Sequence, residues 1–198
     1  MVSADAGVAS VVLTGDEIAK RVAELGATLS EHYADSRLLC VGVLRGAFVF
    51  MADLARALAI PAEFDFMAVS SYGKATKTSG VVRILKDLDQ DVAGQDVLLV
   101  EDIVDSGLTL AYLLDYLRSR GPASLEVCAL LRKPAAAKVD VAVRWTGFEI
   151  PNRFVVGYGL DAAGLYRNLP FVGVLDDATI TKVTSGGEAA ATAGKDSQ

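Results

Sequence analysis

The sequence predicts an α/β fold in which helices flank a central, mostly parallel sheet. Three largely apolar runs, at 37–44, 96–102 and 124–131, have the length and composition of buried parallel strands. Segments in which apolar residues recur at helical spacing separate these runs, as in a repeating strand–helix fold. Two adjacent carboxylates, Glu101 and Asp102, end the second run, and ligands bind at the carboxyl edge of such sheets.

The first half of the chain begins with a capped helix. Thr14 as N-cap and Glu17 three residues later form a capping-box pattern, and helical spacing continues to about Tyr33. The polar stretch 70–80, rich in small residues, predicts a long loop. The remaining elements expected in this half are strands at 37–44, 62–70 and 81–85 and a helix at 46–59.

The second half contains the clearest strand, 96–102, followed by a helix at 108–119 and a strand at 124–131. Beyond Lys133 the apolar runs are short, and we expect them to form a small hood subdomain. These runs are 141–145, 154–156 and 171–174. The expected organisation is a flexible tail at 1–10, one domain at 11–184 whose hood uses the N-terminal segment and 141–176, and a disordered tail at 185–198.

Composition narrows the class of protein. The chain has 198 residues, 52% hydrophobic and 22% charged, which suits one domain with a sizeable core. Its net charge of −6 disfavours a basic nucleic-acid-binding protein. Cys40 and Cys128 lie in apolar runs, so we expect buried free thiols in a reducing cytoplasm. We find neither a signal peptide nor an apolar run near the ~20 residues of a membrane span, and we expect a soluble, cytoplasmic protein.

The segment 97–109 combines two binding devices. Glu101 and Asp102 suit a sugar diol, because ionised carboxylates only accept hydrogen bonds. The next turn, Asp105-Ser-Gly-Leu-Thr109, leads into a helix, and its N–H groups and hydroxyls suit a phosphate dianion. A plain strand followed by an N-cap at Asp105 or Ser106 would explain the turn but not the acidic pair. The combination therefore predicts a sugar-phosphate site.

Residues 100–109, Val-Glu-Asp-Ile-Val-Asp-Ser-Gly-Leu-Thr, resemble the phosphoribosyl-pyrophosphate motif of type I phosphoribosyltransferases, most closely the hypoxanthine-guanine branch. Other stretches follow in the family's order, and the resemblance runs from about Val12 to Asp176. They are Gly42-Val-Leu-Arg-Gly46, Ser70-Ser-Tyr-Gly73, Leu131-Arg-Lys133 and 147–161. The resemblance implies the type I phosphoribosyltransferase fold and a purine-salvage glycosyltransferase. Such an enzyme joins N9 of hypoxanthine or guanine to phosphoribosyl pyrophosphate and releases pyrophosphate.

The resemblance also implies roles around the phosphate motif. Glu101 and Asp102 meet the ribose hydroxyls and associate with Mg²⁺. Asp105 is the catalytic base that accepts the N7 proton of the purine as N9 attacks C1 of the ribose. The 5′-phosphate lies on Asp105, Ser106, Gly107, Leu108 and Thr109. Many relatives have Lys at the position of Leu108, which is a departure that the backbone N–H groups tolerate.

Pyrophosphate binding is implied at two places. At Leu44-Arg45-Gly46 the family has a non-proline cis peptide whose N–H faces pyrophosphate, whereas the sequence alone favours an ordinary strand-to-helix turn. Arg167 matches the second pyrophosphate-binding group, whose fork holds phosphate oxygens at two points. Ala162 stands where relatives have an aromatic residue, which is a departure from the family pattern close to Arg167.

Base recognition, a second metal and a lid complete the implied site. Phe154 stacks on the purine, where core packing is the alternative, and Lys133 donates to the 6-oxo group. Backbone groups of Val155 and Asp161 read the rest of the base, and the Asp161 carboxylate binds a second Mg²⁺. Ser71 and Tyr72 belong to a closing lid that excludes water.

Rival functions remain open at this point. A xanthine-preferring enzyme would share these motifs, and Lys133 argues against adenine. A phosphoribosyl-pyrophosphate-sensing RNA-binding regulator on the same fold would need a basic face, which the net charge of −6 disfavours. Retention of Asp105, Lys133 and Arg167 disfavours a non-catalytic scaffold. The resemblance implies a homodimer or homotetramer, with neither nucleic acid nor membrane as partner.

Overall fold

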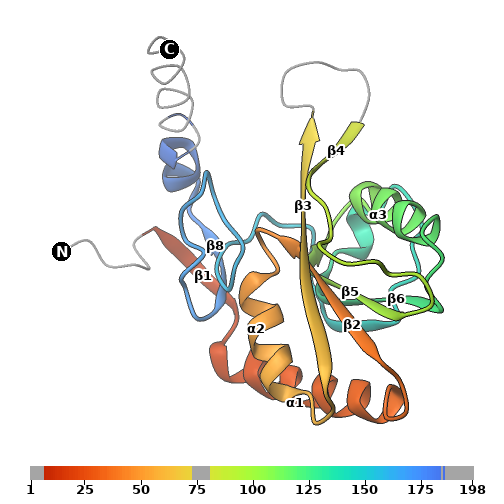
Figure 1. Ribbon diagram of the computed structural model, residues 1–198. Coiled ribbons are helices and arrows are strands. Elements are labelled where there is room, and N and C mark those ends of the chain that lie inside the picture. Colours follow the sequence, from red (N-terminus) through yellow and green to blue (C-terminus); the bar gives the residue numbers. More distant parts are fainter. Residues whose placement is uncertain (1–6, 73–80, 184, 186–198) are drawn as a thin grey trace. The chain divides into compact units, whose positions relative to one another are not determined.

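In the computed structural model the described residues are 7–72, 81–183 and 185, and the side chains of 71, 72 and 81 lie outside this description. The main sheet consists of β2 (Leu38–Leu44), β3 (Ala62–Tyr72), β4 (Val81–Lys86), β5 (Asp96–Val104), β6 (Ser124–Arg132) and β7 (Trp145–Glu149). Within the described part of the chain these strands lie in the order β4-β3-β2-β5-β6-β7 (Figure 1). β4 is antiparallel to β3 and the other neighbours are parallel, which confirms the predicted fold class.

Three labelled helices accompany the strands, and residues 177–183 near the C-terminal end of the described chain are also helical. The labelled helices are α1 (Gly15–His32), α2 (Phe48–Ala57) and α3 (Leu108–Arg118), with a 3₁₀ turn at Pro134–Ala136. The helices and strands predicted up to residue 131 are confirmed in type and order, and β5 continues past the acidic pair to Val104. The start of the loop predicted at 70–80 is strand, since β3 continues to Tyr72, and residues 73–80 lie outside the described residues. Helices cover both sides of the sheet (Figure 1), and the central strand β2 is accordingly apolar along its whole length.

The start of α1 carries the predicted capping box. The Thr14 N–H donates to Glu17 Oε2 at 2.8 Å, and the Glu17 N–H donates to Thr14 Oγ1 at 3.3 Å. The Thr14 N–H bond and a second bond from the Thr14 hydroxyl to Glu17 Oε2, at 2.7 Å, lower the pKa of the Glu17 carboxyl. The reciprocal bonds satisfy two N–H groups that a helix start leaves unpaired.

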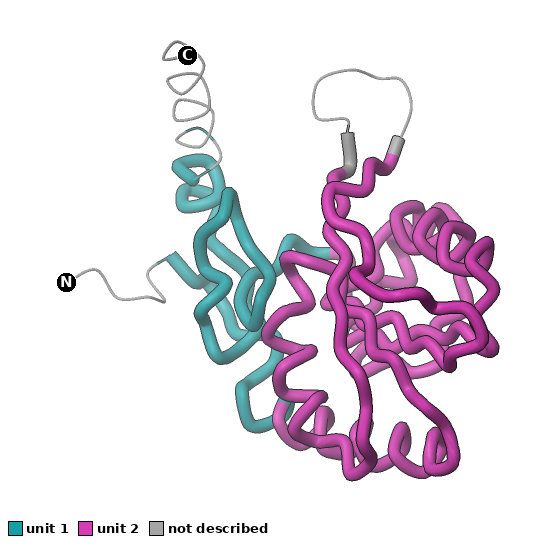
Figure 2. Tube along the Cα trace, viewed as in Figure 1, with its two compact units in different colours: residues 1–18, 153–198 teal, residues 19–152 magenta. Residues whose placement is uncertain are grey.

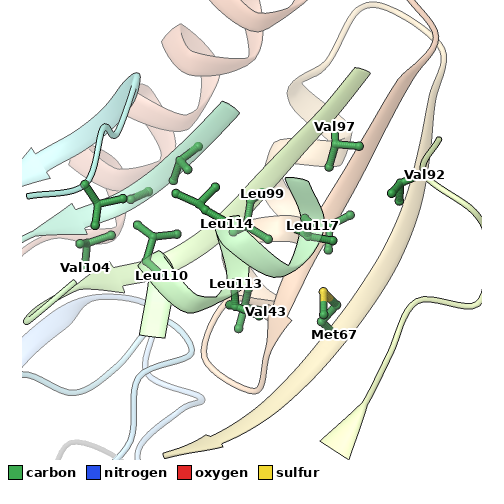
Figure 3. Close-up of a cluster of buried hydrophobic side chains, with 14 of the residues drawn as sticks. Val43, Met67, Val92, Val97, Leu99, Val104, Leu110, Leu113, Leu114 and Leu117 are labelled. Carbon is green, nitrogen blue, oxygen red and sulfur yellow. The ribbon is translucent and has the colours of Figure 1, made fainter. Parts of the chain in front are cut away.

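The core of the main sheet forms on the face covered by α3 (Figure 3). Alternate residues of β2 point into it, since successive side chains of a strand face opposite sides. Leu113 and Leu117 of α3 are both fully buried there. The other helix residues of the cluster are Leu110 and Leu114, and the β2 residues are Leu39, Val41 and Val43. This packing fixes α3, whose first residues, Leu108 and Thr109, end the predicted phosphate segment.

Truncating the centre of this core should strongly destabilise the protein. Leu113 is 0% exposed, so we expect Leu113→Ala to lower the free energy of unfolding by about 2–5 kcal/mol. Leu85, which is 63% exposed on β4, provides the control, and Leu85→Ala should change it by less than about 0.5 kcal/mol. Urea unfolding measures both. Equal losses in the two variants would contradict this description of the core.

The chain divides into two compact units (Figure 2). Residues 19–152 form unit 2, which contains the main sheet, and residues 1–18 with 153–198 form unit 1. In unit 1, β1 (Val8–Leu13) pairs antiparallel with β8 (Val172–Leu175). β1 thus begins inside the segment expected to be a tail, because its backbone finds a partner far along the sequence. Of the tail expected to be disordered at 185–198, all but Ser185 lies outside the described residues.

Residues 141–144 do not form the predicted strand. The strand in this region is β7, which begins at Trp145 and pairs in parallel with β6. β7 therefore extends the main sheet of unit 2 and is not part of a hood. Arg21 of α1 holds it, donating from Nε to the Gly147 carbonyl at 2.9 Å and from Nη2 to that of Thr146 at 2.8 Å. The expected strand at 154–156 is also wrong, since only Val156 makes an isolated bridge.

Two expectations from composition can be compared with the structure. Cys40 and Cys128 are buried free thiols, as predicted, and burial raises the pKa of the Cys40 thiol to about 12. Among the described residues, none of the helices has the length and apolar character needed to cross a membrane.

Candidate active site

A pocket of about 210 Å³ opens where β5 ends and α3 begins. β5 contributes the acidic pair, and the turn after β5 and the first turn of α3 contribute the opposite wall. The lining consists of residues 101–107 with Val43, Thr109 and Leu110. The two binding devices predicted from the sequence therefore share one pocket at the carboxyl edge of the sheet.

The acidic pair sits in two different environments. Glu101 is only 7% exposed, and this burial raises the pKa of its carboxyl well above the ordinary range, with the Asp102 charge adding to the effect. Asp102 Oδ1 accepts a hydrogen bond from the Ile103 N–H at 2.8 Å. Because a buried carboxylate is costly without a partner, hydroxyl donors or a cation at this place would stabilise its ionised form.

The turn after β2 lies against this pair. A Cβ atom at Gly46 would overlap the Asp102 carboxylate, so only glycine allows the backbone to approach it. The peptide bond between Leu44 and Arg45 is cis, as the family resemblance implied, and the ordinary turn favoured by sequence alone is wrong. The structure thus places Leu44-Arg45-Gly46 beside the pocket predicted for the sugar phosphate.

The turn leading into α3 has the backbone features of an anion-binding site. The Ser106 carbonyl accepts hydrogen bonds from the N–H groups of Lys138 (3.0 Å) and Val139 (3.2 Å), which fix the turn. Gly107 is the N-cap of α3, with φ of 79° and no side-chain capping bond to the helix. The Leu108 N–H donates to Ser106 Oγ at 3.5 Å, and residues of this turn and helix start line the pocket, where a phosphate can accept from helix N–H groups.

Gly107→Ala should damage this turn for two reasons. An added Cβ would lie 2.7 Å from the Val139 carbonyl oxygen, and the left-handed φ disfavours any residue with a Cβ. We expect a loss of about 1–3 kcal/mol in unfolding free energy and weaker binding of a ribose 5-phosphate. Urea unfolding and calorimetric titration test this. Gly121→Ala, also at positive φ but with open space around it, separates the two causes.

Asp105 pairs with Lys133 and does not cap the helix. Lys133 Nζ lies 3.1 Å from Asp105 Oδ2, with the lysine side chain 7% exposed and the aspartate 54% exposed. The Lys133 N–H donates to the Val104 carbonyl at 2.9 Å, which anchors the lysine beside the end of β5. Neither Asp105 nor Ser106 is the N-cap, because Gly107 occupies that position, although Ser106 Oγ accepts a bond of 3.5 Å from the Leu108 N–H.

The remaining described site residues belong to unit 1, which is considered by itself. Phe154 is 48% exposed, so plain core packing does not explain its ring, whereas Val155 is buried. Arg167 Nη2 lies 2.6 Å from Asp161 Oδ1. Ala162 is 2% exposed and packs in the small core of unit 1, so its departure from the family pattern is accommodated.

The structure groups the predicted site residues into two sets. Unit 2 holds the acidic pair, the phosphate turn, Lys133 and the Leu44-Arg45-Gly46 turn, and unit 1 holds the set around Arg167. The side chains of Ser71 and Tyr72, assigned to a lid, lie outside the described residues. Sequence reasoning missed the Asp105–Lys133 ion pair and the approach of Gly46 to Asp102. Neither contact has a local signal, since its members stand far apart in sequence.

Fold and pocket together define a phosphoribosyltransferase. The chain belongs to this family, because the family model described as a phosphoribosyl transferase domain matches residues 9–163. Its relatives place it in one branch. It is 56% identical over 173 residues to the hypoxanthine-guanine phosphoribosyltransferase of Mycobacterium avium, covering 84% of this chain and 85% of that protein. The protein of that name from Bacillus subtilis is 52% identical over 168 residues, covering 85% and 93%.

Solved structures agree with this placement. A hypoxanthine phosphoribosyltransferase from Staphylococcus aureus matches with a TM-score of 0.84 and 43% identity, covering 87% of this chain and 94% of that one. The Trypanosoma cruzi enzyme, solved with its product IMP, matches with a TM-score of 0.82 and 38% identity, covering 87% and 97%.

Proposed function

We propose that the protein is a hypoxanthine-guanine phosphoribosyltransferase. It transfers the 5-phosphoribosyl group of phosphoribosyl pyrophosphate to N9 of hypoxanthine or guanine, giving IMP or GMP and pyrophosphate. The observation that carries this proposal is the pocket in which an acidic strand end faces an uncapped helix start. A sugar bearing a terminal phosphate matches both halves, and relatives above 50% identity carry the corresponding name.

The ribose phosphate is held by complementary groups. Glu101 and Asp102 accept from the two ribose hydroxyls, which offsets the cost of burying the Glu101 carboxylate. The 5′-phosphate accepts from N–H groups and hydroxyls of 105–109, including the backbone of Leu108, which therefore needs no lysine side chain. The N–H groups of the Leu44-Arg45-Gly46 turn and the Arg167 guanidinium bind the pyrophosphate.

Asp105 acts as the catalytic base, and Lys133 selects which purine reacts. As N9 attacks C1 of the ribose and the bond to pyrophosphate breaks, Asp105 accepts the N7 proton. Its half-exposed side chain can reach a bound purine, while the buried Lys133 donates to the 6-oxo group. Phe154 stacks on the ring, and backbone groups of Val155 and Asp161 read the remaining edge. Ser71 and Tyr72 belong to the lid.

Mg²⁺ is the implied cofactor. The donor chemistry fits Mg²⁺ at the buried Glu101 beside Asp102, and Asp161 offers a further carboxylate. Among the described residues no three such side chains cluster, so waters and substrate phosphates would complete the coordination. When bound, the metal neutralises charge on the departing pyrophosphate. We further propose a cytoplasmic enzyme that assembles as a homodimer or homotetramer, without nucleic acid or membrane as partner.

Nucleotide formation from separate bases tests the function. The full-length chain, Mg²⁺ and phosphoribosyl pyrophosphate are combined with hypoxanthine, guanine, xanthine or adenine, and the product is separated by chromatography. We expect IMP and GMP, with adenine used at least roughly 100-fold less efficiently because it lacks the 6-oxo acceptor. Dominant use of xanthine would favour the xanthine-preferring enzyme, and dominant use of adenine would contradict the role of Lys133.

A further inference from the structure

The loop at 157–169 of unit 1 holds a tightly bonded ion pair. Arg167 Nη2 lies 2.6 Å from Asp161 Oδ1, and Arg167 Nη1 donates to the Gly159 carbonyl at 2.6 Å. The second carboxylate oxygen, Asp161 Oδ2, accepts from the Gly164 N–H at 2.6 Å. Both oxygens of the aspartate and both terminal nitrogens of the arginine are therefore engaged within one loop.

The backbone of this loop fixes the pair in place. The Gly159 N–H donates to the Arg167 carbonyl at 3.0 Å, and Ala162 and Leu165 exchange two backbone hydrogen bonds. Ala163 and Tyr166 adopt positive φ values of 50° and 72°, which residues with a Cβ rarely do unless the surrounding structure imposes it. Since the Arg167 and Asp161 side chains are only 23% and 30% exposed, the pair is more than a chance meeting of flexible surface groups.

The partners of this pair have separate assignments in the proposed function. Asp161 is the carboxylate for a metal, and Arg167 is the cation for pyrophosphate. In the structure these two side chains are paired with each other. A divalent metal on Oδ1 would stand where the Arg167 Nη2 group now lies, and two cations repel at that distance.

We infer that Asp161 and Arg167 form an exchangeable pair, in which a divalent cation displaces the guanidinium from the carboxylate and frees it for an anion. This inference rests on the proposed function. The bond from Nη1 to the Gly159 carbonyl keeps Arg167 near its place after exchange, so that Nη2 is released without loss of the whole side chain to solvent. Metal binding and anion binding are then coupled through one residue pair, and the coupling must be reciprocal.

Metal titration of the free chain tests this exchange without reference to catalysis. Mn²⁺ is the probe, and its free concentration is followed by electron paramagnetic resonance with the full-length chain in the absence of substrates. Arg167→Gln removes the competing cation, so Mn²⁺ should bind roughly fivefold or more tightly than to the unmodified chain. Lys182→Gln removes one positive charge from an exposed position in the same unit and should leave the affinity unchanged.

Two further variants locate the effect. Asp161→Asn combined with Arg167→Gln should abolish the gain, whereas a gain that persists would assign the metal to other carboxylates and overturn the inference. Arg167→Lys keeps the charge but not the two-point fork, so it should give an intermediate affinity even if Arg167→Gln folds poorly. Equal Mn²⁺ affinities for the unmodified chain, Arg167→Gln and Arg167→Lys would also overturn it.

The failure of this inference is distinct from failure of the proposed function. Equal metal affinities in a chain that makes IMP would remove the exchange and leave the transferase intact. A chain that makes no nucleotide from any purine, yet gains Mn²⁺ affinity in Arg167→Gln, would keep the competition at Asp161 and contradict the function.

Discussion

Asp105→Asn should lower turnover by about 100-fold or more, because removal of a positioned general base typically costs 10²–10⁴ in rate. Asparagine has nearly the same shape as aspartate, and its carbonyl can still accept from the buried Lys133 ammonium, now 3.1 Å from Asp105 Oδ2. The pocket geometry is therefore preserved while the proton acceptor is lost. Steady-state kinetics of IMP formation and calorimetric titration with phosphoribosyl pyrophosphate measure the two effects separately.

The contrast between these two measurements identifies the role of Asp105. Affinity for phosphoribosyl pyrophosphate should change little, since the 5′-phosphate meets backbone N–H groups of 106–109. Asp115→Asn, on the exposed side of α3, is the matched control and should behave like the unmodified chain. Unchanged turnover in Asp105→Asn would remove the base role, and an equal loss of affinity and turnover would make Asp105 a binding residue.

Lys133→Gln should erode the preference for 6-oxopurines over adenine by about 10- to 100-fold. A fixed cationic donor is matched to a 6-oxo group and mismatched to a 6-amino group, so discrimination at such a site exceeds what pocket shape alone provides. Glutamine offers a donor and an acceptor on the same side chain and can meet either base. Because the Lys133 side chain is only 7% exposed, water cannot take over its role as donor in the variant.

Competition kinetics measures this selectivity directly. The ratio of kcat/KM for hypoxanthine to that for adenine is determined for the unmodified chain, Lys133→Gln and the control Lys20→Gln, whose side chain is exposed on α1. The control should keep the original ratio. A ratio that stays high in Lys133→Gln would move recognition of the 6-oxo group to another residue.

Local patterns were sufficient for much of the fold. The capping box at Thr14 and Glu17, the apolar run of β5 and the leucines of α3 each predict an element from neighbouring residues alone, and each is confirmed. The acidic pair and phosphate turn were also predictable, because both lie in one short segment. The limits of β7 were not predictable in this way, since they depend on hydrogen bonds from β6 and Arg21.

The contacts that complete the site join distant parts of the sequence. Lys133 reaches Asp105 because β5 and β6 are parallel neighbours, which puts the ends of both strands at one edge. Gly46 meets Asp102 because β2 lies on the other side of β5. These contacts follow from the order of the strands in the sheet. Residue spacing within a single segment does not reveal that order.

A crystal structure with GMP and Mg²⁺ bound tests the ribose-phosphate pocket most directly. The predicted result is a 5′-phosphate about 3 Å from the N–H groups of 106–109, with the ribose hydroxyls on Glu101 and Asp102. A nucleotide bound elsewhere, with its phosphate away from this turn, would contradict the proposed function at its foundation.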